Sequence, residues 1–186
     1  RSGMTWPRIE RHAELASTMD RARELAEAGA PAGTVVVADF QTAGRGTRDR
    51  IWLAPAGSCL MFTIISRPTI GPASLADLPA RVSEAICGYL RATLGLACEV
   101  KPPNDIVVDG RKLCGVLCAS KIVGERVEHV LIGIGLNTRM SRDQLPLETA
   151  TSLLIETGGC PGHDELLDGL LSALEEATSD ARWFCH

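Results

Sequence analysis

The feature that most constrains the fold is a pair of uninterrupted apolar runs, GTVVVADFQ over residues 33–41 and SCLMFTIIS over residues 58–66. Both have the length of a strand, and they contain many β-branched or aromatic side chains, so we expect two buried strands. Further strands are predicted within residues 98–122 and over residues 125–138. The Asp109–Gly110 pair, which separates residues 106–108 from residues 112–120, is a hairpin signal.

Three other segments have the spacing of amphipathic helices, over residues 17–30, 74–95 and 163–184. Ser17 or Thr18 is a suitable N-cap for the first helix. Helices and hairpin-linked strands therefore mix along the chain, without repeats or a clear linker. We expect an α+β fold in which a mixed, largely antiparallel sheet carries helices, in a single domain over residues 1–186.

Charge and cysteine content argue against several functional classes. The net charge is −4, so no basic surface supports nucleic-acid binding. The apolar runs are shorter than a bilayer-spanning helix requires. Among the cysteines, Cys114 and Cys118 lack the second pair or nearby histidine that would complete a metal site. We expect buried, reduced thiols in a cytoplasmic protein with no membrane or nucleic-acid partner.

Polar and glycine-rich loops follow the predicted strands at three places, within residues 41–52, 101–112 and 133–138. In the first loop Arg45 lies between two glycines. A glycine turn can present backbone N–H groups to an anion, and arginine adds charge-assisted bonds to phosphate. An exposed turn with solvated charges explains the same composition, so both interpretations stay open. No Walker motif is present, and the third loop lacks the third glycine of a dinucleotide fingerprint.

Lys112 begins the apolar strand after the second loop. Its ammonium group either extends into water or points into a cleft and meets an anionic group. Asn104 and Asp105 are turn-forming residues that could also hold Mg²⁺ or a hydroxyl group. Asn137 either caps the end of its strand or bonds a ligand. The residues alone leave these alternatives open.

The chain contains six short motifs, which are Ser17–Thr18, Gln41–Gly46, Arg50–Gly57, Lys101–Asp105, Arg111–Gly115 and Gly133–Asn137. Taken together, these motifs resemble the catalytic domain of biotin protein ligases, in the biotin/lipoate ligase superfamily. The resemblance runs from about Ser17 to Leu153, and its specificity comes from six short motifs in the family's order. It implies a mixed sheet with helices on one face, as in the class II aminoacyl-tRNA synthetase and biotin ligase fold.

The resemblance also implies a reaction. The carboxylate of biotin attacks the α-phosphate of ATP with Mg²⁺, which gives biotinyl-5'-AMP, and a lysine of a biotin carboxyl carrier protein domain then takes the biotin. A homodimer is compatible with it. The implied catalytic residues are Lys112 and Arg45. The implied biotin-binding residues are Ser17, Thr18, Gln41, Gly44, Arg45, Lys112, Gly115 and Leu117. The implied ATP-binding residues are Arg48, Arg50, Trp52, Asn104, Asp105 and Asn137, with Asp105 as the metal ligand.

Three positions depart from the family pattern. Thr47 replaces an arginine that helps to hold the adenylate, Pro102 replaces a tryptophan, and Ala119 replaces a frequent acidic residue. We also expect no N-terminal helix-turn-helix and no C-terminal β-barrel, which leaves a single catalytic domain. The alternatives are a lipoate or octanoate ligase of the same fold, a biotin-binding pseudo-enzyme without transfer activity, and a ligase that releases its adenylate.

Overall fold

The computed structural model describes residues 8–46, 48, 50–52, 54–145 and 147–178. Its main element is a seven-stranded sheet in the order β1-β2-β5-β9-β8-β7-β6. β1 and β2 run parallel, and the other neighbouring pairs run antiparallel, so the predicted mixed, largely antiparallel sheet is confirmed. The strands are β1 (Arg8–Leu15), β2 (Thr34–Gln41), β5 (Cys59–Ser66), β6 (Glu99–Lys101), β7 (Asp105–Val108), β8 (Arg111–Val123) and β9 (Arg126–Asn137).

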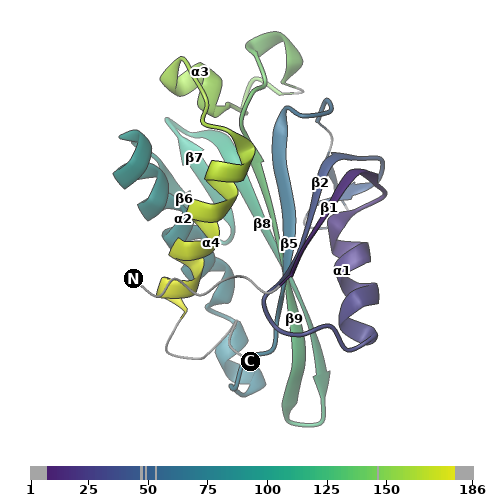
Figure 1. The fold of residues 1–186 in the computed structure, drawn as a ribbon. Helices are drawn as coiled ribbons and strands as arrows, with labels where there is room; N and C mark the ends of the chain where they lie inside the picture. The colour runs from purple at the N-terminus through teal and green to yellow at the C-terminus, as the bar shows by residue number, and fades with distance from the viewer. Residues whose placement is uncertain (1–7, 47, 49, 53, 146, 179–186) are drawn as a thin grey trace.

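Helices cover both faces of this sheet (Figure 1). α2 (Leu78–Leu94) and α4 (His163–Ala177) lie together on one face, whereas α1 (Thr18–Glu27) lies on the opposite face. The expectation of helices on one face only is therefore wrong. The physical reason lies in β5, whose residues are all buried, because a strand that is apolar on both sides needs cover on both sides. A short helix, α3 (Leu153–Thr157), precedes α4.

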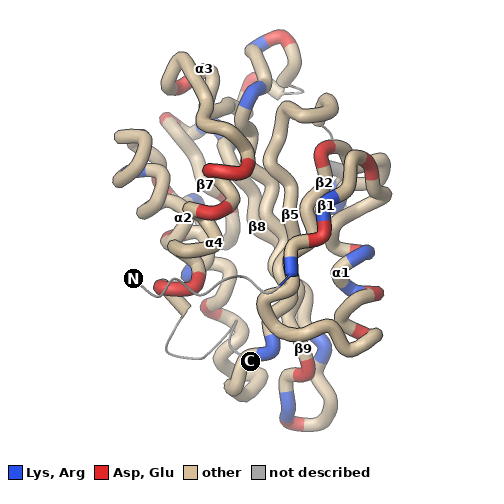
Figure 2. Tube along the Cα trace, in the orientation of Figure 1, with Lys and Arg blue, Asp and Glu red and all other residues tan. Residues whose placement is uncertain are grey.

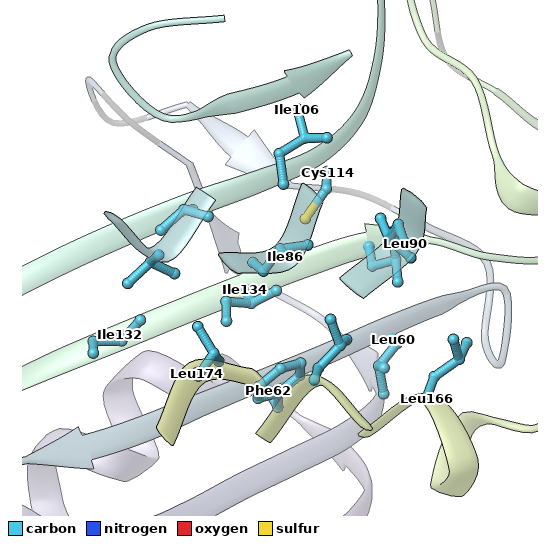
Figure 3. Close-up of a cluster of buried hydrophobic side chains, with 14 of the residues drawn as sticks. Leu60, Phe62, Ile86, Leu90, Ile106, Cys114, Ile132, Ile134, Leu166 and Leu174 are labelled. Atoms are coloured by element: carbon cyan, nitrogen blue, oxygen red, sulfur yellow. The ribbon is translucent and has the colours of Figure 1, made fainter. Parts of the chain in front are cut away.

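Two apolar clusters fill the layers on either side of the sheet. The larger cluster lies between the sheet and the α2–α4 layer, and Figure 3 shows its strand and helix side chains directed toward one another. Phe62 and Leu174 are fully buried there. The smaller cluster lies under α1 and contains Met19, Ile65 and Leu131. This second cluster contains fewer apolar side chains than the first, and a pocket lies beside it.

Several local predictions are confirmed. The Ser17 side chain caps α1 by accepting a hydrogen bond from the backbone N–H of Met19. Asp109 and Gly110 both have positive φ, at 49° and 78°, as a tight hairpin turn requires. The helix expected from residue 74 instead begins at Leu78, with a proline in its first turn, and residues 72–75 form a 3₁₀ turn.

The edge strand β1 and the ends of two predicted elements differ from expectation. β1 has the sequence RIERHAEL, whose charged residues do not suggest a strand, but charge is common on strands that lie at the edge of a sheet. The last helix is described as far as Ala177. The part of its predicted range from residue 179 onward lies outside the described residues. Two further strands, β3 (Gly44–Arg45) and β4 (Ile51–Trp52), form a separate small hairpin.

Acidic and basic residues are interspersed along the chain rather than gathered into one stripe (Figure 2). Among the described residues, every helix is too short or too polar to span a bilayer. The six described cysteines are free, and four of them are buried, as expected. Burial raises the pKa of the Cys118 thiol to about 12, so this thiol stays protonated near neutral pH.

Two histidines make the stability of the fold depend on pH. Burial, together with the nearby cation Arg67, lowers the pKa of His129 below its ordinary value of 6.5. Burial and the cation Arg139 lower the pKa of His163 in the same way. When folding lowers the pKa of a histidine, the stability is full above the unfolded pKa and is lost as the pH falls below it.

We therefore expect the urea midpoint of unfolding to be lower at about pH 5.5 than at about pH 7.5, measured by circular dichroism. Replacing His129 and His163 by glutamine is expected to reduce this difference. If the double variant shows the same difference in urea midpoint between the two pH values as the unaltered protein, these two histidines are not the cause of the pH dependence.

Candidate functional site

A pocket lies on the α1 face of the sheet, between the first turn of α1 and the middle of strands β8 and β9. It is narrow, with a volume of about 50 Å³. Its floor is the sheet, and its walls come from α1, the end of β2 and the β3–β4 hairpin. The lining residues are Ser17, Thr18, Met19, Gln41, Arg45, Gly46, Met61, Asn104, Lys112, Gly115, Val116, Leu117, Gly133, Ile134 and Gly135.

The floor of this pocket follows from the register of the sheet. Met61 pairs with Gly135, Gly135 pairs with Gly115, and Gly115 pairs with Asp105. Residues opposite one another on neighbouring strands project to the same face of a sheet. Because the two middle positions are glycines, no side chain rises between Met61 and Asp105. The glycines thus leave room for a ligand on an otherwise covered face.

The wall of the pocket at α1 is polar and held by hydrogen bonds. The backbone N–H of Thr18 donates to Gln41 Oε1 at 2.8 Å, and Thr18 Oγ1 lies 2.8 Å from Thr63 Oγ1. Gln41 Nε2 donates to Met61 Sδ at 3.3 Å. Ser17, Thr18 and Gln41 are each at least nine-tenths buried. The hydroxyl and amide groups of this wall are therefore fixed in direction, as a site that recognises a polar ring would need.

A β-bulge directs Lys112 toward the same pocket. Ile106 pairs with Cys114 but Val107 pairs with Lys112, so Leu113 is an extra residue on β8. Leu113 lies in the core on the α2–α4 side, fully buried. Strict alternation along β8 would have placed Lys112 on that apolar side, and the bulge instead turns it to the face of Gly115.

Lys112 lies where two pockets meet. Its Nζ is 3.1 Å from Asp105 Oδ1, and its backbone is held by hydrogen bonds to Thr149 and Thr151 at 2.7 and 2.8 Å. Lys112 and Gly46 line both the narrow pocket and a neighbouring larger one. The geometry favours the interpretation in which the ammonium group points into a cleft and meets an anionic group.

The larger pocket has a volume of about 430 Å³, which is within the usual range for small-molecule sites. Its lining combines cationic and carboxylate side chains with apolar side chains. Asn137 contributes a buried amide, whose Nδ2 donates to the Thr151 carbonyl at 3.0 Å. The lining residues are Gly46, Arg50, Ile51, Lys101, Asp105, Val107, Gly110, Lys112, Asn137, Met140, Leu147, Thr149 and Ala150.

The glycine–arginine loop forms the β3–β4 hairpin beside both pockets. The backbone N–H of Gly46 donates to the Arg50 carbonyl at 2.7 Å, which closes the turn. Arg45 binds Asp20 in the first turn of α1, with Nε 3.0 Å and Nη2 3.3 Å from the carboxylate oxygens. This ion pair joins the loop to α1 across the mouth of the narrow pocket.

Most of the predicted site residues come together in these pockets. Of the predicted biotin-binding residues, all but Gly44 line the narrow pocket, and Gly44 is buried within β3. Of the predicted ATP-binding residues, Arg50, Asp105 and Asn137 line the larger pocket.

The remaining predicted residues lie elsewhere. Asn104 lines the narrow pocket instead, and its Nδ2 donates to the Val116 carbonyl at 2.9 Å. Arg48 is exposed and lines neither pocket. Thr47 and the side chain of Trp52 lie outside the described part of the structure.

Sequence reasoning did not place four residues in the narrow pocket: Met19 and Met61, and the glycines Gly133 and Gly135, which it gave only as part of a family motif. Strand alternation was the available signal for the two glycines, because they are two and four residues before Asn137 on the same strand. No pattern in the sequence indicates Met61, since its role depends on which strands are neighbours in the sheet.

Residues 13–137 match the model of the biotin/lipoate A/B protein ligase family. The bifunctional ligase/repressor BirA of Bacillus spizizenii is 38% identical over 89% of this chain and 52% of its own length, so the chain spans about half of that relative. The biotin–[acetyl-CoA-carboxylase] ligase of Paracoccus denitrificans is 34% identical, over 90% of this chain and 69% of its own.

A solved structure gives the same result. The biotin protein ligase of Aquifex aeolicus, in complex with biotin and ATP, superposes with a TM-score of 0.77 at 27% identity, over 95% of this chain and 72% of that one. The sheet and its helices thus have the architecture of biotin protein ligases, as predicted from the sequence. The chain belongs to the biotin/lipoate A/B protein ligase family.

Proposed function

We propose that this protein activates biotin with ATP to biotinyl-5'-AMP and transfers the biotin to a lysine of a biotin carboxyl carrier protein domain. One observation supports this most strongly: Lys112 lies on the boundary between a narrow pocket with a fixed polar wall and a larger pocket with room for a nucleotide. An acid in the first pocket and a triphosphate in the second would meet at its ammonium group.

The polar wall and glycine floor of the narrow pocket suit an acid whose polar ring lies far from its carboxylate. Ser17, Thr18 and Gln41 would bond the ureido ring, and Gly115 and Leu117 would line the pocket beside the ligand. From Lys112 to Leu117 the strand extends about 15 Å, which accommodates a ring and a short alkyl chain. The carboxylate would then lie at Lys112.

In the first step, a carboxylate oxygen of biotin attacks the α-phosphorus of ATP. A new oxygen–phosphorus bond forms, the bond from the α-phosphorus to the bridging oxygen breaks, and pyrophosphate leaves with that electron pair. Negative charge on the α-phosphate oxygens grows in the transition state, so a fixed cation beside them lowers the barrier. Lys112 would supply this cation, with Arg45 and Arg50 at the margin of the two pockets.

Mg²⁺ fits the larger pocket through Asp105. The carboxylate of Asp105 lines this pocket, and Mg²⁺ in nucleotide sites commonly takes one or two carboxylates together with phosphate oxygens. Within the described residues, no group of three or more histidine, cysteine, aspartate or glutamate side chains could hold a metal ion by itself. Mg²⁺ bound to the phosphates of ATP would meet Asp105 and would neutralise phosphate charge there.

In the second step, the amine of the carrier lysine attacks the carbonyl carbon of biotinyl-5'-AMP. An amide bond forms, the bond from that carbon to the phosphate-bound oxygen breaks, and AMP leaves. Both pockets are built on one continuous sheet, which supports a single catalytic domain. Free, buried thiols support a reducing compartment such as the cytoplasm.

The proposal is tested by incubating the purified chain with ATP, Mg²⁺ and either biotin or lipoate, and by measuring pyrophosphate release. We expect release that depends on biotin, and biotin on the lysine of an added carrier domain. Release that depends on lipoate alone would favour the lipoate ligase. Biotin binding by calorimetry without pyrophosphate release would favour the pseudo-enzyme. If neither biotin binding nor pyrophosphate release is detected, the proposal is wrong.

Asp20→Asn is expected to weaken the retention of biotinyl-5'-AMP by about two- to fivefold, because the Arg45–Asp20 ion pair that holds the loop to α1 is partly exposed. The measurement is the dissociation rate of the adenylate in a chase with unlabelled biotin and ATP. Asp164→Asn is the matched control, since it breaks an exposed ion pair with Arg11 instead. Equal rates for the two variants would contradict a role for the Arg45 contact.

A further inference from the structure

We propose that Met19 is the adjustable wall of the narrow pocket and sets the size of the ring that this pocket accepts. The inference rests on the proposed function for the identity of the ligand. It concerns the end of the pocket farthest from Lys112, where Leu117 of β8 pairs with Gly133 of β9.

Met19 separates the pocket from the apolar cluster under α1. It lines the pocket, and it also belongs to that cluster together with Ala22 and Leu131. Only 5% of its surface is exposed. Any ligand that extends beyond Leu117 would therefore meet the thioether of Met19 before it reached the cluster.

The Met19 side chain lies directly on the backbone of Gly133. A Cβ atom built on Gly133 would be 2.7 Å from Met19 Sδ and 3.2 Å from its Cγ. A separation of 2.7 Å is too short for two such atoms, so one of them would have to move. The glycine thus makes room for the methionine, and the position of the methionine depends on the glycine.

Met19 is the part of this wall that is able to move. The backbone of Met19 is held, because its N–H donates to Ser17 Oγ at 3.1 Å. Thr18 and Gln41 are fixed by the hydrogen bonds described above. The methionine side chain has three rotatable bonds and adapts to its surroundings. A pocket of about 50 Å³ has room for only a few water molecules, so a bound ring requires a side chain to shift.

Two variants and their combination test this coupling, with biotin affinity measured by calorimetry on the whole chain. Gly133→Ala is expected to weaken binding about tenfold, because the new methyl group pushes Met19 into the pocket. Met19→Ala removes the displaced group. When Met19 is already alanine, adding Gly133→Ala is therefore expected to lower biotin affinity by less than about threefold. Gly88→Ala, which has open space around its added Cβ in α2, is the control and should leave affinity unchanged.

A second arm does not depend on the folding of the Gly133 variant. Met19→Ala is expected to shift the ratio of affinities by about tenfold toward a biotin analogue that is N-methylated on its ureido ring. Two results would overturn the inference. One is a double variant whose loss of biotin affinity equals the product of the two single losses, and the other is a Met19→Ala variant with an unchanged ratio of affinities for the N-methylated analogue and for biotin. If the unaltered protein does not bind biotin at all, the proposed function fails instead.

Discussion

Replacing Lys112 with methionine is expected to lower the rate of biotin-dependent pyrophosphate release by about 10²–10³-fold, the usual effect of removing one fixed group that stabilises transition-state charge. Methionine keeps much of the length of the side chain and removes its charge. Lys112 is the described cation that lines both pockets. The variant should therefore lose the chemical step while it retains the fold.

The measurement is single-turnover formation of biotinyl-5'-AMP, with ATP and biotin above saturation so that weaker binding does not limit the rate. Lys121→Met is the matched control on the same strand. Lys121 pairs with Glu128 at 3.4 Å near the β8–β9 turn, away from both pockets. If Lys112→Met forms biotinyl-5'-AMP at the same rate as Lys121→Met, Lys112 does not take part in the chemical step.

Replacing Gly115 with valine is expected to weaken biotin binding by about 100-fold, because the valine side chain would fill the open floor between Met61 and Asp105. ATP binding in the larger pocket should change much less, since Gly115 does not line that pocket. Calorimetric titration with each ligand alone separates the two effects.

Ala119→Val is the control for this change. Ala119 is on the same strand, four residues from Gly115, and it packs beside the smaller apolar cluster rather than in the narrow pocket. Its biotin affinity should stay within about threefold of the unaltered protein, the range of ordinary surface and boundary substitutions. Equal losses from both valine variants would mean that the β8 strand, and not the pocket floor, accounts for the effect.

The order of short motifs was enough to identify the fold and most of the site. Lys112 was singled out because it begins an apolar strand beside a loop of unusual composition, and Gln41 was assigned through the family motif Gln41–Gly46. The buried strands β2 and β5 were identified because both of their faces are apolar. Such signals are local, so a single sequence contains them.

The parts that were missed depend on how distant segments pair. Met61 reaches the pocket because β5 and β9 are neighbours, and no local pattern specifies that pairing. The residues alone left the direction of Lys112 open, because it depends on the extra residue Leu113 and a shift of one residue reverses the face of a strand side chain. Sequence reasoning also missed β1, whose charged residues suit the edge of a sheet and resemble a loop.

We expect the departure from the family pattern at Thr47 to affect the retention of the intermediate. The cations that line the pockets are Arg45, Arg50, Lys101 and Lys112, and they come from the described residues on either side of it. The cationic side chains that act in the proposed first step all belong to this set. Diffuse biotinylation of a bystander protein would indicate that the adenylate escapes, whereas labelling confined to the carrier lysine would indicate that it is held.

The central step of the proposed function is the attack of a biotin carboxylate oxygen on the α-phosphate of ATP. The most direct measurement uses biotin labelled with ¹⁸O in its carboxylate, in a complete reaction with ATP, Mg²⁺ and a carrier domain, followed by mass spectrometry of the nucleotide. The attacking oxygen remains on phosphorus when the carrier amine displaces AMP. We expect AMP that contains one ¹⁸O atom from each turnover. Unlabelled AMP, or the label in pyrophosphate, would contradict it.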